Sequence, residues 1–127
     1  MFKRIDHVEI VTSNLERTLK FYTEILGFKI QQKMNPGRPP IEELVFIELG
    51  GTMIEIFSVK EPVLLSEEIW QIGCRKFAIE VDDLDKTVDY LQSKGIELSE
   101  EIIAVESLKR AEIKDPDGLS IELIQRD

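Results

Sequence analysis

An internal repeat constrains the fold of this chain more than any other feature of its sequence. Residues 5–15 (IDHVEIVTSNL) resemble residues 74–84 (CRKFAIEVDDL), and residues 51–57 (GTMIEIF) resemble residues 118–124 (GLSIELI). Identity between the copies is low, but they share the order of apolar, acidic and helix-capping positions. A repeated pattern of this kind marks one supersecondary unit that occurs twice. The sequence therefore predicts two modules with the same succession of strands and helices.

The first copy predicts a strand, a helix and three further strands. Apolar residues alternate from Ile5 to Val11, as in a half-buried strand, and Ser13 or Asn14 can cap a helix that runs to Leu26. Gly27 suits the C-terminal end of that helix. The expected strands that follow are residues 28–33, 43–49 and 52–58, the last two joined by the hairpin signal Gly50-Gly51.

The second copy predicts the same order of elements. Residues 75–81 form a candidate strand, Asp83 can cap a helix that ends at Ser93 or Lys94, and Gly95 closes that helix. The expected strands that follow are residues 96–100, 108–114 and 119–125, the last two joined by the turn Asp115-Pro116-Asp117-Gly118.

Length and composition narrow the class of protein. A chain of 127 residues, 43% of them hydrophobic, can bury the core of one domain. We expect this domain over residues 1–127, with module 1 at 1–59, module 2 at 73–127 and a linker at 60–72.

The formal net charge of −9, without any long basic run, argues against a nucleic-acid partner. No apolar stretch reaches the roughly 18 residues of a membrane span, and none follows the N-terminus as in a signal peptide. The single cysteine fits a reducing compartment, so we expect a cytoplasmic protein with no membrane partner.

Strand periodicity places four polar side chains at matching positions of the two copies. His7, the only histidine, is equivalent to Lys76, and Glu55 is equivalent to Glu122. Each of the two glutamates has apolar neighbours on its own strand face, which favours a lined cavity over a wet surface. If a pseudo-two-fold axis relates the modules, the four side chains meet in one cleft.

The pattern resembles a known family. A tandem βαβββ pair of this length, with GGTMIE near the end of one copy and DPDGLSIEL at the end of the other, is similar to the vicinal oxygen chelate superfamily, which includes glyoxalase I, extradiol dioxygenases and bleomycin-resistance proteins. The resemblance covers nearly the whole chain and is closest to small glyoxalase-like proteins. It implies an α+β fold in which the two modules form a curved mixed sheet around a cleft. It also implies a homodimer that takes a small-molecule substrate or ligand.

The resemblance also implies a metal site. In metal-binding members of the family the four matching positions carry the ligands, which here implies a divalent ion, Zn, Ni, Mn or Fe, on His7, Glu55 and Glu122. The fourth position departs from the pattern. Lys76 stands there, and a lysine with its ordinary pKa of about 10.4 is an ammonium ion without a lone pair to donate. Lys76 therefore argues against a metal.

Three interpretations of Lys76 remain open. In the first, its charge replaces the metal and neutralises Glu55 and Glu122, and the protein is a metal-free small-molecule binding protein of the bleomycin-resistance type. In the second, which we prefer, the protein is a glyoxalase-like lyase or isomerase that acts next to a carbonyl, with a metal on three ligands, Lys76 and Arg38 binding substrate, and Glu55 or Glu122 as catalytic base. In the third, Lys76 is a catalytic amine, which the facing carboxylates disfavour because they raise its pKa.

Overall fold

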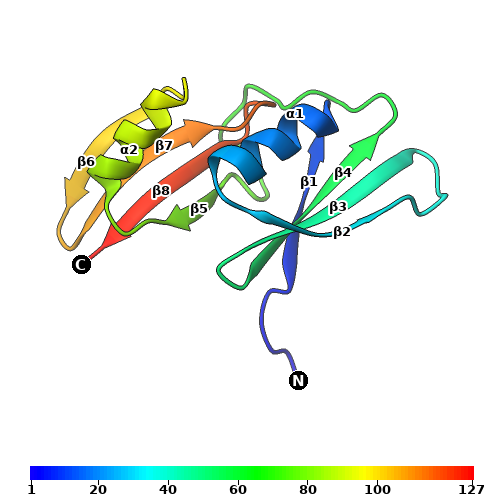
Figure 1. The fold of residues 1–127 in the computed structure, drawn as a ribbon, viewed down its shortest axis with the longest axis horizontal. Helices are drawn as coiled ribbons and strands as arrows, with labels where there is room; N and C mark the ends of the chain where they lie inside the picture. Colours follow the sequence, from blue (N-terminus) through cyan, green and yellow to red (C-terminus); the bar gives the residue numbers. More distant parts are fainter. The chain divides into compact units, whose positions relative to one another are not determined.

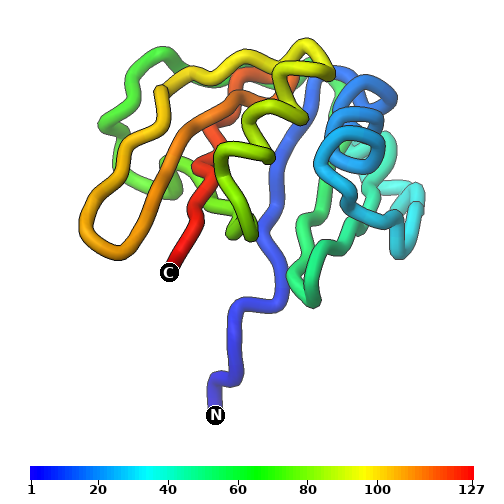
Figure 2. Tube along the Cα trace, turned by 60° about the vertical axis from the view of Figure 1, so that its left-hand side comes forward, coloured from blue at the N-terminus to red at the C-terminus, as the bar shows by residue number.

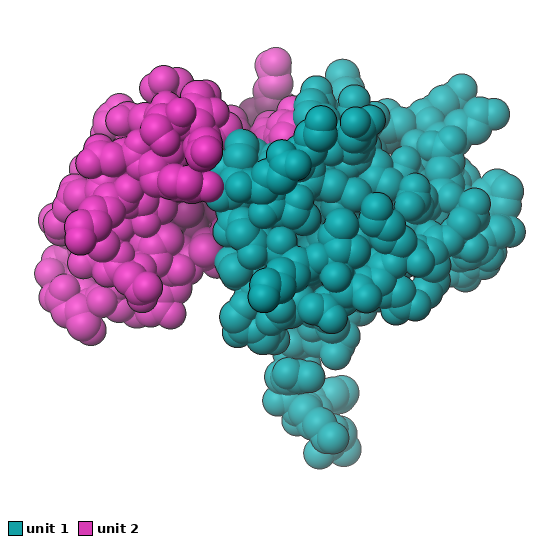
Figure 3. Space-filling view, viewed as in Figure 1, with its two compact units in different colours: residues 1–64 teal, residues 65–127 magenta.

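The chain folds into two four-stranded mixed sheets, each with one helical segment (Figure 1). The computed structural model describes all residues from 1 to 127. Contacts divide the chain into two compact units, unit 1 at Met1–Leu64 and unit 2 at Leu65–Asp127 (Figure 3). The predicted α+β class and the tandem βαβββ plan are confirmed. The predicted linker bounds at 60–72 stay a prediction.

Unit 1 has the sheet order β1-β4-β3-β2, in which β1 and β4 are parallel and the other neighbours antiparallel. Its strands are β1 (His7–Thr12), β2 (Lys29–Met34), β3 (Ile41–Leu49) and β4 (Thr52–Val59). Helix α1 (Leu15–Lys20) packs against this sheet and continues as a π-helical turn, η1 (Phe21–Ile25). The predicted cap is confirmed, because the Asn14 side chain accepts a hydrogen bond of 3.0 Å from the Arg17 N–H.

The core of unit 1 follows the predicted strand alternation. Ile54 and Ile56 of β4 are buried together with Val45 and Ile47 of β3. Glu55 lies between the two isoleucines and therefore points to the opposite face of the sheet. The register of β3 and β4 is set by their hairpin, where Gly50 and Gly51 both take positive φ, 58° and 85°, as the predicted two-residue turn requires.

Unit 2 has the sheet order β5-β8-β7-β6, with β5 and β8 parallel. Its strands are β5 (Phe77–Glu80), β6 (Glu100–Val105), β7 (Leu108–Lys114) and β8 (Ser120–Arg126). Helix α2 (Leu84–Ser93) contacts β7 and β8, and its path beside these strands can be followed in Figure 2. The predicted Asp83 cap is confirmed by a 3.1 Å hydrogen bond that its side chain accepts from the Lys86 N–H.

One predicted strand of unit 2 is wrong. Residues 96–100 were expected to form a strand, but the strand β6 begins only at Glu100. Ile96 instead closes the end of α2 by donating its N–H to the Leu91 carbonyl at 2.9 Å. A tight turn then pairs Val105 with Leu108, with Glu106 at a φ of 48°. Because a glutamate occupies the positive-φ position that glycine usually takes, the sequence carries no visible signal for this hairpin.

The N-terminal residues before β1 extend away from the sheet of unit 1 (Figures 1 and 2). The apolar side chains of Met1, Phe2 and Ile5 are exposed in this segment. None of the helices has the length and apolar character that crossing a membrane requires.

Candidate functional site

In unit 1, three polar side chains converge at the β1–β4 pair. The parallel register places Glu9 of β1 directly beside Glu55 of β4, and His7 precedes Glu9 by two residues on the same face. His7 Nε2 lies 3.4 Å from Glu55 Oε1 and 3.5 Å from Glu9 Oε2. One ligand atom from each of the three residues lies within 4.8 Å of the others. We call His7, Glu9 and Glu55 the His7 cluster.

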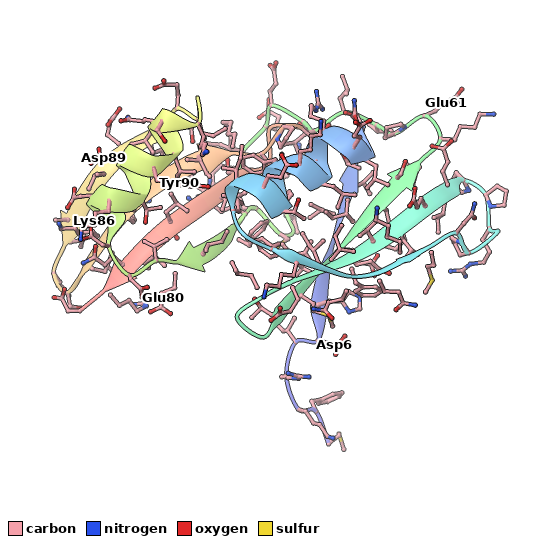
Figure 4. The ribbon with its side chains drawn as sticks, viewed as in Figure 1. Asp6, Glu61, Glu80, Lys86, Asp89 and Tyr90 are labelled. Atoms are coloured by element: carbon pink, nitrogen blue, oxygen red, sulfur yellow. The ribbon has the colours of Figure 1, made fainter.

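Two neighbours fix the orientation of the His7 ring. Nδ1 lies 2.9 Å from Asp6 Oδ2, so a proton on Nδ1 is donated to that carboxylate. Asp6 is the residue immediately before β1 (Figure 4). The ring of Phe46 meets the imidazole edge-on, with ring centroids 5.3 Å apart. Because Asp6 engages Nδ1, Nε2 is the ring nitrogen that faces the two glutamates. As an N–H it pairs with them, and once deprotonated it offers its lone pair to an ion, the arrangement in which a carboxylate presets a histidine as a metal ligand.

The His7 cluster is short of positive charge. The Glu55 side chain is only 9% exposed, and within unit 1 His7 is its only ion-pair partner. Burial and then the Glu9 charge raise the pKa of Glu55, against which His7 acts. The hydrogen bond to Asp6 raises the pKa of His7, although desolvation opposes it. Two carboxylates thus share one imidazole.

This donor set fits a divalent ion. Imidazole nitrogen and carboxylate oxygen are the ligands that Zn²⁺, Ni²⁺, Mn²⁺ and Fe²⁺ accept. The environment of Glu55 also favours an ion. Its carboxylate is buried and its pKa is raised, so a nearby cation would stabilise the ionised form. The residues present in unit 1 therefore suit the metal that the family resemblance implies.

In unit 2, Lys76 has a carboxylate partner that the sequence analysis did not single out. Its Nζ lies 3.0 Å from Glu112 Oε2 on β7, and Ser99 Oγ donates to Glu112 Oε1 at 2.8 Å. We call Lys76, Ser99 and Glu112 the Glu112 network. Burial by itself raises the pKa of Glu112, but the hydrogen bonds from Ser99 and Lys76 and the Lys76 charge outweigh it and hold this pKa below its ordinary value. Within unit 2 the ion-pair partner of Lys76 is Glu112, and the expected pairing of Lys76 with Glu55 and Glu122 stays a prediction.

Glu122 is also engaged within unit 2. Arg110 Nη1 lies 3.2 Å from Glu122 Oε1 and 3.3 Å from Glu100 Oε2. Glu122 is the register partner of Glu112 across the β7–β8 hairpin, so both carboxylates occupy the same face of the sheet. Each already has a basic partner.

The two registers show how the repeat diverged. Phe46 pairs with Glu55 in unit 1, and Glu112 pairs with Glu122 in unit 2, so Glu112 occupies the place of Phe46. Ala78 pairs with Glu122 as Glu9 pairs with Glu55, so alanine replaces the second carboxylate of the His7 cluster.

The predicted site residues therefore fall into three groups. His7 and Glu55 are brought together, whereas Lys76 and Glu122 have partners of their own in unit 2. Arg38 is exposed in the loop between β2 and β3.

Three residues that matter to these sites were not predicted from the sequence. Asp6 and Glu112 were not considered, and Glu9 was left out of the predicted ligands. Glu9 had a usable signal in its spacing of two from His7, and Glu112 had one in its register with Glu122 across the turn at Asp115-Pro116-Asp117-Gly118.

Comparisons with known proteins agree with this architecture. The family model of the Glyoxalase/Bleomycin resistance protein/Dioxygenase superfamily matches residues 4–123. The chain is 35% identical over 129 residues to "Probable lactoylglutathione lyase, chloroplastic" of Arabidopsis thaliana, an alignment that covers 98% of this chain but only 36% of the relative. It is 32% identical over 129 residues to YwkD of Bacillus subtilis, with 99% of each chain covered. The chain thus spans about a third of the plant relative and nearly all of the bacterial one.

Solved structures show the same fold. A glyoxalase family protein from Enterococcus faecalis superposes with a TM-score of 0.85 at 31% identity, covering 97% of this chain and 98% of that one. The trypanothione-dependent glyoxalase I of Leishmania major superposes with a TM-score of 0.78 at 26% identity, covering 98% of this chain and 87% of that one.

Proposed function

This chain belongs to the Glyoxalase/Bleomycin resistance protein/Dioxygenase superfamily, and we propose that it is a metal-dependent lyase or isomerase acting on the carbon next to a carbonyl of a small molecule. The observation that carries the proposal is the contact between His7 and the buried, raised-pKa carboxylate of Glu55. Relatives named lactoylglutathione lyase support this reaction class.

The residues that would hold the ion are His7 and Glu55, and the family resemblance implies Glu122 as a third ligand. A divalent ion bound there would polarise the carbonyl of a substrate. His7 is preset for this role, because Asp6 engages Nδ1 and leaves Nε2 facing Glu55.

Glu55 is the better candidate for the catalytic base. A general base works best when its pKa approaches the working pH, and burial raises the pKa of Glu55 in that direction. Its carboxylate would take the proton from the carbon beside the carbonyl and return it to the neighbouring carbon. Glu122 is the second candidate, but it has first to leave Arg110.

Lys76 and Arg38 are the proposed substrate-binding residues. An ammonium group has three N–H donors, and the Lys76 ammonium gives one to Glu112. The remaining donors suit an anionic group of the substrate. Arg38 is exposed on its loop and would bind such a group from solvent.

We also propose that two copies of the chain associate. The large apolar side chains exposed between positions 63 and 72 support this, because a contiguous exposed apolar segment favours a protein interface. They are Val63, Leu64, Leu65, Ile69, Trp70 and Ile72. Light scattering on the purified protein would give the mass of a monomer if the proposal is wrong.

A metal-free small-molecule binding protein is the second candidate function. The Glu112 network favours it, because Lys76 stands at the predicted fourth ligand position with its charge already matched by Glu112.

Two measurements test the proposed function. Elemental analysis of protein purified without an affinity tag should find a divalent ion, and the loaded protein should form a thioester from methylglyoxal and a thiol such as glutathione. Glu55→Gln should abolish turnover, whereas the matched control Glu80→Gln, an exposed glutamate on β5 (Figure 4), should leave it unchanged. A bound ion without turnover of any carbonyl substrate would exclude the enzyme, and neither ion nor turnover would favour the metal-free binder.

A further inference from the structure

We infer that the ion is held by His7, Glu9 and Glu55 of unit 1, and that Glu122 is not one of its ligands. This inference rests on the proposed metal-dependent function but concerns the ligand set, which the sequence predicted as His7, Glu55 and Glu122. Glu9 takes the third place because the register of β1 and β4 sets it directly beside Glu55.

The distances within the His7 cluster match those between ligands of one ion. Two ligand atoms about 2.1 Å from an ion at tetrahedral angles lie about 3.4 Å apart. His7 Nε2 lies 3.4 Å from Glu55 Oε1 and 3.5 Å from Glu9 Oε2. Both separations exceed the roughly 2.7–3.2 Å of an ordinary N–H···O hydrogen bond. The imidazole is therefore spaced from both carboxylates as two ligands of one cation are, and the third pair, Glu9 and Glu55, lies within 4.8 Å.

Charge supports an ion beside His7 and Glu55, although it is the same whether the third ligand is Glu9 or Glu122. Two carboxylates and a neutral imidazole carry a charge of −2, which a divalent ion cancels. Asp6 supports the neutral ring as a ligand, because it accepts the Nδ1 proton and leaves Nε2 for the ion.

Glu122 is a poorer ligand than Glu9 for an electrostatic reason. It would have to give up its 3.2 Å contact with Arg110, which would leave that guanidinium with only the more exposed Glu100. Glu9 has no basic side chain as a partner other than His7, and its carboxylate is 59% exposed, so it can turn toward an ion without breaking another ion pair.

Titration calorimetry with Co²⁺ on metal-free full-length protein tests this inference, with the visible absorption of bound Co²⁺ as a second readout. The variants are Glu9→Gln and Glu122→Gln, with Glu80→Gln as a control carboxylate. We expect one ion per chain, a loss of affinity of about tenfold or more in Glu9→Gln, and wild-type affinity and absorption in Glu122→Gln. Far-ultraviolet circular dichroism checks that each variant folds.

Two outcomes would overturn the inference. The first is a loss of affinity in Glu122→Gln with none in Glu9→Gln, which would restore the ligand set predicted from the sequence. The second is a wild-type protein that takes up no ion. Failure of the proposed enzymatic function is a separate result, since it would appear as the expected Co²⁺ binding, weakened in Glu9→Gln and kept in Glu122→Gln, together with no turnover by the loaded protein.

Discussion

Two buried glutamates on the polar sheet faces of the two units differ in what surrounds them. Glu55 in unit 1 has its pKa raised, because burial and the neighbouring Glu9 outweigh His7. Glu112 in unit 2 is as deeply buried, yet Ser99 and Lys76 donate to it and hold its pKa down. A buried carboxylate with enough donors stabilises its surroundings, whereas one short of donors is suited to bind a cation or a proton. The two units therefore use one architecture for a structural pair and for a candidate reactive site.

The charges of the two sites express the same difference. In unit 2 the cations Lys76 and Arg110 match Glu112 and Glu122. In unit 1 the basic partner of both Glu9 and Glu55 is a single group, His7. A divalent ion would bring unit 1 to the balance that unit 2 reaches with its own side chains.

The largest expected effect comes from breaking the Glu112 network. Glu112→Ala leaves the Lys76 ammonium, which is 14% exposed, without its partner, and should lower the free energy of unfolding by about 3 kcal/mol. Glu55→Ala in metal-free protein should cost clearly less, because Glu55 is ionised only against a burial penalty. Urea denaturation with a chelator present measures both. Equal losses would remove the distinction between the two carboxylates.

Metal should stabilise unit 1 through the His7 cluster. At a free ion concentration about 100 times the dissociation constant, the wild-type free energy of unfolding should rise by about 2.7 kcal/mol. His7→Gln should abolish this gain, and Lys76→Ala should retain it, because Lys76 belongs to the Glu112 network. Thermal melts with and without added Co²⁺ give the result. A gain that survives in His7→Gln would place the ion elsewhere.

The pH dependence of stability should identify Glu112 among the carboxylates. Its folded pKa lies below the ordinary 4.5, so its contribution is complete above pH 4.5 and is lost as the pH falls through that lower folded pKa. Glu112→Gln should therefore flatten the loss of stability below pH 4.5. Glu101→Gln, which changes an exposed glutamate of the same unit, serves as the control. Parallel acid limbs in wild type and Glu112→Gln would contradict the assignment.

The smallest effect concerns a feature that the units share. Asn14 and Asp83 each cap a helix by accepting a backbone hydrogen bond, at 3.0 and 3.1 Å. Asn14→Ala and Asp83→Ala should each lower the free energy of unfolding by about 1 kcal/mol. Denaturant titration of the two variants side by side makes the comparison. If the two losses in the free energy of unfolding differ by more than about 1 kcal/mol, the two caps do not stabilise the protein equally.

Much of the fold was predictable because its signals are local. Caps at Asn14 and Asp83, positive-φ glycines at Gly50 and Gly51, and the two-residue alternation around Ile54 depend on neighbours within a few residues. The strand β6 was misplaced where such a signal was lacking, since Glu106 turns the chain without glycine.

The sequence by itself determined the repeat, the order of the elements and the face on which His7 and Glu55 lie, because backbone periodicity and turn chemistry are properties of short segments. Only the tertiary structure decided that Glu9 lies beside Glu55, and that Lys76 forms an ion pair with Glu112. These contacts join residues 36 or more positions apart in the chain, so they follow from strand register and from the balance of charge and burial across the folded sheet.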